Sequence, residues 1–174
     1  INRLSNVYTD EGMEIKINMS SLFIELEVYN KSNEPIFINW SKSEILEGNR
    51  GFSLVASMGY NPSLHKGNNL NNNILPQAST VIPLNEKFSF MLMKSMNAKW
   101  QKFSNNDKGF WTANKPFWGL SSQSKDNKDE MQEHANSVLG KKFKLNIFTI
   151  IGDQEKNMLF DISLIKASIV KINW

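Results

Sequence analysis

The residues best suited to binding chemistry are six large aromatic side chains crowded between Trp100 and Trp118 and interleaved with lysines. Aromatic faces stack on sugar rings, and Trp is enriched at the centres of protein interfaces. The candidate partner-binding or ligand-binding residues are therefore Trp100, Phe110, Trp111, Phe117 and Trp118. Burial of most of these rings is the favoured alternative, because a long crossover segment is usually held in place by its rings. Trp111 and Trp118 stand beside small or flexible residues and are the two expected at the surface.

Few residues of the sequence are suited to catalyse hydrolysis. A Ser or Thr nucleophile needs a base within hydrogen-bond reach, and neither His65 nor His134 has a motif around it. Both are interpreted as solvated surface side chains. Glu25 and Glu27 lie two residues apart on an alternating segment, which places them on its outward side rather than around a scissile bond. No catalytic residue is predicted, although an enzyme built on an unrecognised carboxylate pair stays open as a third alternative.

The sequence predicts no metal and no cofactor. Zinc needs three or four suitable ligands, and the segment from Glu130 to His134 offers at most two on one helical face. The chain has no Cys, so it has neither a disulfide framework nor a thiolate nucleophile. Its nine Gly are scattered and form no phosphate-binding loop. The protein is therefore expected to be non-enzymatic.

Length and composition indicate one folded domain. The chain has 174 residues, of which 40% are hydrophobic and 21% charged, and this leaves enough apolar residues for one core. The net charge is +3, with the basic excess in the middle third. Only Arg3 and Arg50 could make the forked contacts that read guanine, so nucleic acid is not an expected partner.

Most of the chain alternates between apolar and polar residues, which is the period-two pattern of half-buried strands. The turn at 30–35 ends one such segment with Pro35, and the turn at 48–51 separates two others. The alternating segments are 13–19, 24–28, 36–40, 52–56, 80–84, 88–92, 143–147, 160–164 and 170–174. Short strands at this spacing predict an all-β fold, a two-sheet antiparallel β-sandwich of immunoglobulin-like architecture.

Two stretches break the alternation. Residues 59–77 include an Asn-rich run and are interpreted as a long loop. Residues 94–139 form a long insertion whose first half carries the aromatic side chains and whose second half is polar. A short helix is expected at 128–138, with Met131, Ala135 and Val138 on one side. No interdomain linker or repeat is found, so residues 1–174 are predicted to be one β-sandwich domain with an insertion at 94–139.

The stretch from Phe23 to Trp40, with its strand, Asn-Lys-Ser turn, Pro-Ile step, second strand and Trp, resembles small bacterial β-sandwich proteins. These have a water-stress-protein-like or immunoglobulin-like fold, and many are cell-envelope lipoproteins. Leu75-Pro76 ahead of 81–83, and the hairpin at 141–164, look like the same pattern. The resemblance covers about half of the chain. It implies an extracytoplasmic accessory domain, in the periplasm or at the cell surface, and carries over no site residues.

The leading functional hypothesis is a non-enzymatic accessory or binding module of the bacterial cell envelope. It would dock on a larger, membrane-associated protein assembly through an exposed sheet edge or through the 100–118 insertion. The alternative is a carbohydrate-binding module that stacks sugars on Trp111 or Trp118. The start at Ile1 suggests a processed or trimmed product, and any lipid anchor lies outside this sequence.

Overall fold

A computed structural model describes residues 6–19, 23–58, 78–102, 109–113, 132–133 and 136–165; for residues 100–102 and 109–113 it describes the backbone only. The strands are β1 (Val7–Thr9), β2 (Met13–Met19), β3 (Ile24–Asn30), β4 (Ile36–Glu47), β5 (Arg50–Met58), β6 (Ser79–Ile82), β7 (Lys87–Lys94), β8 (Ala98–Lys102), β9 (Gly109–Ala113), β10 (Lys142–Ile151) and β11 (Gln154–Ser163). A 3-10 turn, η1 (Ser95–Asn97), links β7 to β8.

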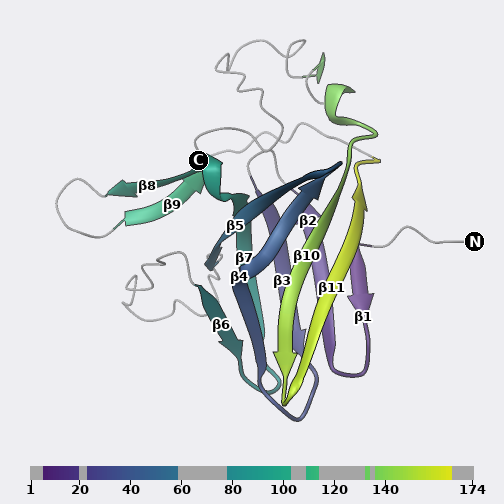
Figure 1. Ribbon diagram of the computed structural model, residues 1–174, viewed down its shortest axis with the longest axis vertical. Helices are drawn as coiled ribbons and strands as arrows, with labels where there is room; N and C mark the ends of the chain where they lie inside the picture. Colours follow the sequence, from purple (N-terminus) through teal and green to yellow (C-terminus); the bar gives the residue numbers. More distant parts are fainter. Residues whose placement is uncertain are drawn as a thin grey trace, which may run out of the picture.

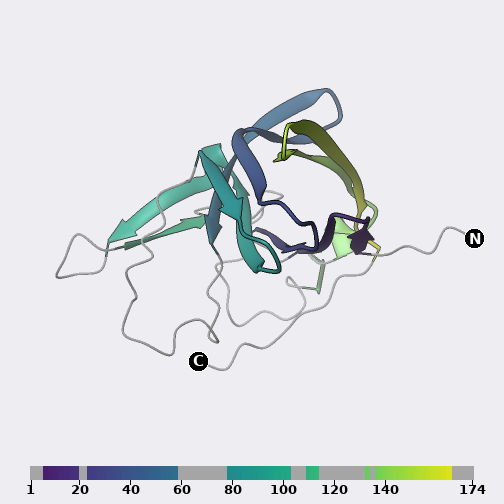
Figure 2. The ribbon, with the colours of Figure 1, turned by 90° about the horizontal axis from the view of Figure 1, so that it is seen from below.

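Nine of these strands form one antiparallel sheet that curls around the core (Figures 1 and 2). The strand order is β1, β2, β3, β7, β5, β4, β10, β11, and β6 pairs with the first part of β4, Ile36–Asn39. Strands β8 and β9 form a separate two-stranded ribbon that projects away from the curled sheet (Figure 1). The two ends of the strand order, β1 and β11, therefore face each other across a seam.

Strand β5 carries the sheet around its corner. Its first residues, Arg50–Ser53, pair with β4, whereas Leu54–Met58 pair with β7. A strand that changes neighbour along its length must bend, and this bend turns the sheet back over its own apolar face. The β4–β5 connection is a tight turn in which Gly48 has a φ of +57°, a conformation that glycine adopts without strain.

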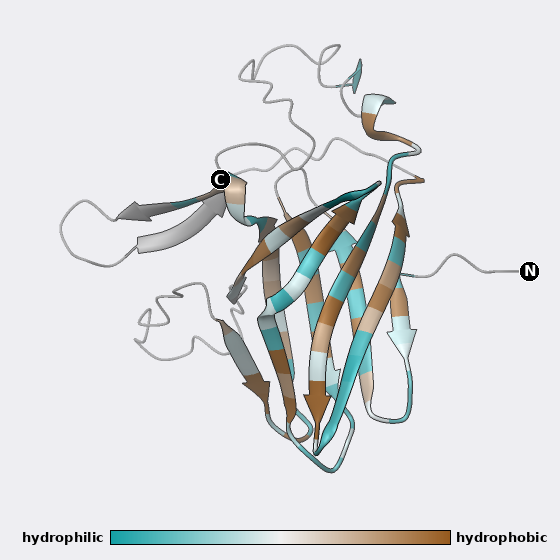
Figure 3. Cartoon of the chain, viewed as in Figure 1, coloured by the Kyte–Doolittle hydropathy of each residue, from teal (hydrophilic) through white to brown (hydrophobic). Residues whose placement is uncertain are grey.

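The core lies inside the curl and consists of the alternating apolar residues. Hydrophobic and hydrophilic residues alternate along the strands in Figure 3, as expected for a sheet with one face buried. Trp40 is buried at its centre. Its indole Nε1–H donates to Thr80 Oγ1 at 2.9 Å, and its ring meets Phe90 edge-on with centroids 4.9 Å apart. The polar end of this large side chain is thus satisfied without reaching water.

A bulge in β4 lets that strand serve two neighbours. Asn39 is aligned with Phe148 and Glu44 with Asn146, so the four residues 40–43 of β4 lie opposite the single residue Ile147 of β10. Ser43 Oγ fills the gap in the ladder, donating to the Asn39 carbonyl at 2.7 Å and accepting from the Phe148 N–H at 3.0 Å. The bulge bends β4 while keeping these buried backbone groups paired.

Asn30 explains the Asn-Lys-Ser turn in structural terms. Its side chain is fully buried and its Nδ2 donates to three backbone carbonyls, those of Glu34, Ile82 and Pro83, at 2.9–3.1 Å. Its Oδ1 accepts from the N–H and hydroxyl of Ser32. One amide therefore ties the β3–β4 turn to the chain after β6, which is an architectural role rather than a binding role.

The structure confirms the all-β class and the antiparallel pairing. The nine strands form one curled sheet with a continuous hydrogen-bonded order, and the division into two sheets of a sandwich stays a prediction. Of the expected helix at 128–138, the described residues include 132–133 and 136–138, whose backbone is helical, and η1 is the one helical element with assigned bounds. The expected loop at 59–77 and strand at 170–174 lie outside the described residues. The single domain over 1–174 with its insertion at 94–139 stays a prediction.

Candidate functional site

The seam between β1 and β11 is closed at one end by side chains. Tyr8 meets Phe160 edge-on with ring centroids 5.7 Å apart. Lys156 Nζ lies 2.9 Å from Asp10 Oδ2 and donates to Tyr8 Oη at 3.3 Å. Tyr8 in turn donates to Asp10 Oδ2 at 2.8 Å. No described strand adds a backbone ladder across this seam, so these contacts hold the two edges together there.

Asp10 is the organising residue of this cluster. Its Oδ1 accepts from the N–H groups of Gly12 and Met13, both at 2.8 Å, which fixes the β1–β2 turn. Burial acts to raise the pKa of the Asp10 carboxyl, but the hydrogen bonds from Lys156, Tyr8, Met13 and Gly12 outweigh it and hold that pKa well below its ordinary value. Hydrogen bonds to Asp10 and Tyr8 raise the pKa of the Lys156 ammonium. The cluster is an ion pair under ordinary conditions and offers no poised acid or base.

Beyond this cluster the seam opens into a groove of about 880 Å³, within the range of ligand and peptide sites. We call it the seam groove. One wall comes from β1, β2 and the start of β3, and the other from β10, β11 and the two residues that follow. The lining residues are Asn6, Val7, Tyr8, Ile17, Asn18, Met19, Ile24, Phe143, Leu159, Phe160, Asp161, Ile162, Ser163, Leu164 and Ile165. The groove is mostly apolar, and Asp161 is the one charged side chain among these described residues.

Exposed apolar side chains gather at this groove. Among the described residues, seven large hydrophobic side chains are exposed, and three of them line it. Those three are Val7 (40% exposed), Leu159 (53%) and Ile165 (68%). Single exposed apolar residues are ordinary, whereas several at the rim of one apolar groove indicate a surface that is covered in use.

The outer edge of β11 has free hydrogen-bonding groups along the groove. Leu164 directs its N–H to Lys141 and its carbonyl to Gly140, on the β10 side. Because residues of an antiparallel ladder alternate in this respect, the N–H and carbonyl groups of Leu159, Asp161 and Ser163 point away from β10. No described strand pairs with that edge. The seam groove thus combines apolar walls with a row of unpaired backbone donors and acceptors.

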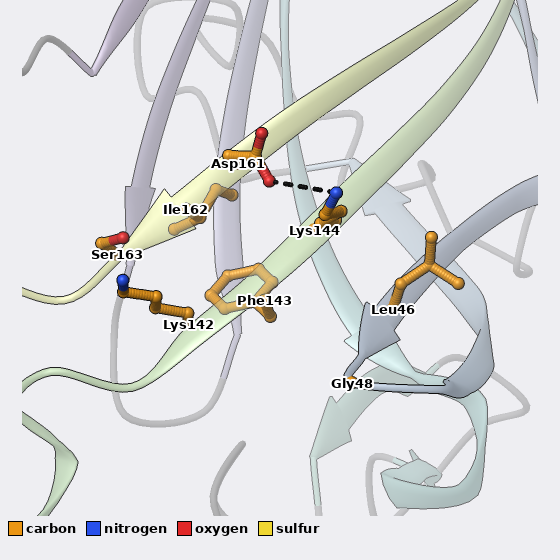
Figure 4. A pocket seen from close by; sticks show the side chains of 8 residues that line it. All are labelled: Leu46, Gly48, Lys142, Phe143, Lys144, Asp161, Ile162 and Ser163. Carbon is orange, nitrogen blue, oxygen red and sulfur yellow. Dashed lines mark ion pairs between the residues drawn. The ribbon is translucent and has the colours of Figure 1, made fainter.

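A smaller hollow of about 220 Å³ adjoins the groove, where Leu46 and Gly48 approach the ends of β10 and β11 (Figure 4). Its charged residues are Lys142, Lys144 and Asp161. Lys144 Nζ lies 3.5 Å from Asp161 Oδ1, but their side chains are 51% and 79% exposed. An ion pair this exposed contributes little to stability. The Asp161 carboxylate therefore remains accessible to a second cation.

A partly buried ion pair lies where β7 leads into the insertion. Lys94, the last residue of β7, is 6% exposed, and its Nζ lies 2.5 Å from Glu47 Oε1. The same ammonium sits over the Phe52 ring, 4.4 Å from its centroid. These contacts join β7 to the β4–β5 turn immediately before η1. The Glu47 side chain is 25% exposed, and neither residue lines a pocket described above, so we assign the pair a structural role.

The aromatic candidates fall on the β8–β9 ribbon or outside the described residues. The ribbon register aligns Trp100 with Trp111 and Gln101 with Phe110. Phe117 and Trp118 lie outside the described residues. The structure thus brings the backbones of Trp100 and Trp111 together, a pairing that the sequence analysis did not predict.

The remaining sequence candidates are not gathered into a site. Glu25 and Glu27 lie on the outward face of β3, and Glu27 pairs with Lys87 at 2.9 Å. His65 and His134 lie outside the described residues. Within the described ranges, no group of three or more His, Cys, Asp and Glu is placed to hold a metal ion.

Sequence reasoning missed the seam groove, although one signal was visible. Apolar Leu159 interrupts the polar side of the 158–164 alternation, and an apolar residue on the outward side of a strand indicates a covered surface.

Within the described part of the chain, no helix is long and apolar enough to cross a bilayer. The comparisons with known proteins leave the chain without an assigned relative: no family model, no curated protein and no solved structure matches it.

Proposed function

We propose that the protein is a non-enzymatic binding module of the bacterial cell envelope, which docks on a larger membrane-associated protein assembly through the seam groove. The single observation that carries the docking surface is the free outer edge of β11 beside an apolar groove rimmed by exposed Val7, Leu159 and Ile165. Open sheet edges are a recurrent way for one protein to bind a segment of another.

The envelope location and the possible tether to a membrane rest on the resemblance of residues 23–40 to small envelope β-sandwich proteins. We also propose that the curled sheet functions as an immunoglobulin-like sandwich of two layers. The change of partners along β5, from β4 to β7, supports this proposal because it is how one strand serves both layers.

The test uses two surface variants with matched exposure. Ile165 (68% exposed) lines the seam groove, whereas Met96 (67% exposed) lies in η1 beside the β8–β9 ribbon. We expect Ile165→Asp to abolish recovery of an envelope partner from detergent-solubilised membranes of the native host, and Met96→Asp to leave it unchanged. A buried charge at an interface costs far more than one at a free surface.

Loss of the partner with Met96→Asp alone would move the docking surface to the insertion and refute the seam groove. Failure of the unmodified full-length chain to recover any envelope protein by chemical cross-linking and mass spectrometry would refute the docking function itself.

The second candidate function is carbohydrate binding at the β8–β9 ribbon. The specific observation in its favour is the register that aligns Trp100 with Trp111, because residues directly opposite in an antiparallel pair belong to one face. Titration with soluble polysaccharides should then change Trp fluorescence in the parent chain and less in Trp111→Ala. Unchanged fluorescence with every polysaccharide would remove this candidate.

A further inference from the structure

We propose that the segment bound in the seam groove is an extended strand of the partner protein that adds to the free edge of β11, with apolar residues at alternate positions and a Lys or Arg beside Asp161. This inference rests on the proposed docking function and names the chemistry of the partner.

The edge of β11 sets the conformation of the occupant. The outward N–H and carbonyl groups of Leu159, Asp161 and Ser163 repeat every second residue, as they do in a strand awaiting a neighbour. A helix would leave these groups unpaired, because its own backbone bonds are internal. An extended segment satisfies all of them.

The groove walls set the side chains of one face of the occupant. Phe160 and Ile162 of β11, and Met19 and Ile24 across the seam, line the groove. Side chains alternate across a strand, so every second residue of an added strand faces these walls. Those residues must be apolar, since a polar group placed there would lose water without gaining a partner.

Charge complementarity determines which side chain the bound strand presents on its other face. Asp161 and Lys144 are register partners on neighbouring strands, and their ion pair at 3.5 Å is highly exposed. An added strand places its own residue on the far side of Asp161. A Lys or Arg there continues a row of alternating charge, whereas a Glu or Asp meets like charge across adjacent strands.

The test titrates the full chain with a synthetic acetylated peptide in which Val alternates with Thr and Lys. A control peptide has the same composition with its Val residues in one block, and a second control has Glu in place of Lys. The readout is NMR, with chemical shifts for affinity and amide exchange at Leu159, Asp161 and Ser163. We expect the alternating Lys peptide to bind at least about tenfold more tightly than either control and to protect those three amides.

Two charge variants are expected to change the affinity for the alternating Lys peptide in opposite directions. Asp161→Asn should weaken the alternating Lys peptide about threefold at low salt, because one exposed ion pair is lost. Lys144→Gln should tighten the same peptide about twofold, because it removes the competitor for Asp161. Both side chains are exposed, so neither change threatens the fold. Added salt should reduce both differences.

Equal binding of the Lys and Glu peptides, or binding without protection of the three amides, would overturn the inference. Protection already present in the free chain, at all protein concentrations, would show that another segment of this chain occupies the edge. Protection that grows with protein concentration would show a second copy there, and either result overturns a partner strand. If no peptide binds but Ile165→Asp still abolishes partner recovery, the strand inference fails while the docking function stands.

Discussion

Replacement of Asn30 should destabilise the protein more than any surface change in the same turn. In Asn30→Ala, the carbonyls of Glu34, Ile82 and Pro83 lose their side-chain donor and the Ser32 N–H loses its acceptor. With about 1 kcal/mol for each of four groups left without this partner, the expected loss is about 4 kcal/mol. That is a large share of the 5–15 kcal/mol that is typical of domains.

The variant Asn30→Asp should make the folding stability depend on pH. The new carboxyl faces three carbonyl oxygens where the amide donated, so its pKa in the folded state is raised above the unfolded value. Stability is then highest below the unfolded pKa of about 3.9 and falls as pH rises toward the folded pKa. The variant should therefore be closer to the parent at pH 4 than at pH 7.5.

The assay is urea unfolding at both pH values, followed by far-UV circular dichroism. Asn33→Ala and Asn33→Asp are the matched controls, because Asn33 is exposed in the same turn. A loss below about 1 kcal/mol for Asn30→Ala, or a pH dependence for Asn30→Asp no larger than for the control, would refute the role given to Asn30 in the β3–β4 turn.

Three further changes test the rest of the fold by the same unfolding assay. Asp10→Asn should cost about 1 kcal/mol at pH 7; since the pKa of Asp10 is held below its ordinary 3.8, this difference should persist at pH 4 and shrink only on further acidification. Trp40→Phe should cost about 2–3 kcal/mol, because it removes a buried hydrogen bond and leaves a cavity. Gly48→Ala and Gly152→Ala should each cost about 1 kcal/mol, because both residues have φ near +60°; a Cβ at Gly152 would also meet the Glu34 carboxylate, but that exposed side chain can rotate away.

The strands with one buried face were readable from the sequence. The alternation from Met13 to Met19 matches β2 at both ends, and the predicted outward position of Glu25 and Glu27 is confirmed. In such strands the pattern of burial is itself the local signal. Pro83 predicts that the segment 80–84 is an edge strand, and β6 agrees because it pairs with β4 alone.

Where the local sequence pattern and the strand pairing disagree, the strand pairing determines the secondary structure. The polar run from Gly152 to Asn157 reads as a turn, but the turn is only Gly152 and Asp153, and β11 begins at Gln154. Ladder bonds to β10 hold these polar residues in a strand whose side chains face water. Strand β1, with three residues, is too short to show any period.

The seam groove could not be predicted, because it depends on strand order rather than on any one segment. Strands β1 and β11 lie at opposite ends of the chain and meet only because β5 turns the sheet back on itself. The apolar residue Leu159 on the outward side of its strand indicated an exposed apolar rim. The residues that lie opposite it across the seam could be predicted only from the full strand order.

The docking account depends most directly on the free edge of β11, and amide hydrogen exchange of the free protein by NMR tests that edge. The account predicts alternation: the N–H groups of Met158, Phe160 and Ile162, directed to β10, exchange slowly, while those of Leu159, Asp161 and Ser163 exchange quickly. Uniform slow exchange along β11 would show that its outer edge is already paired and would contradict the account.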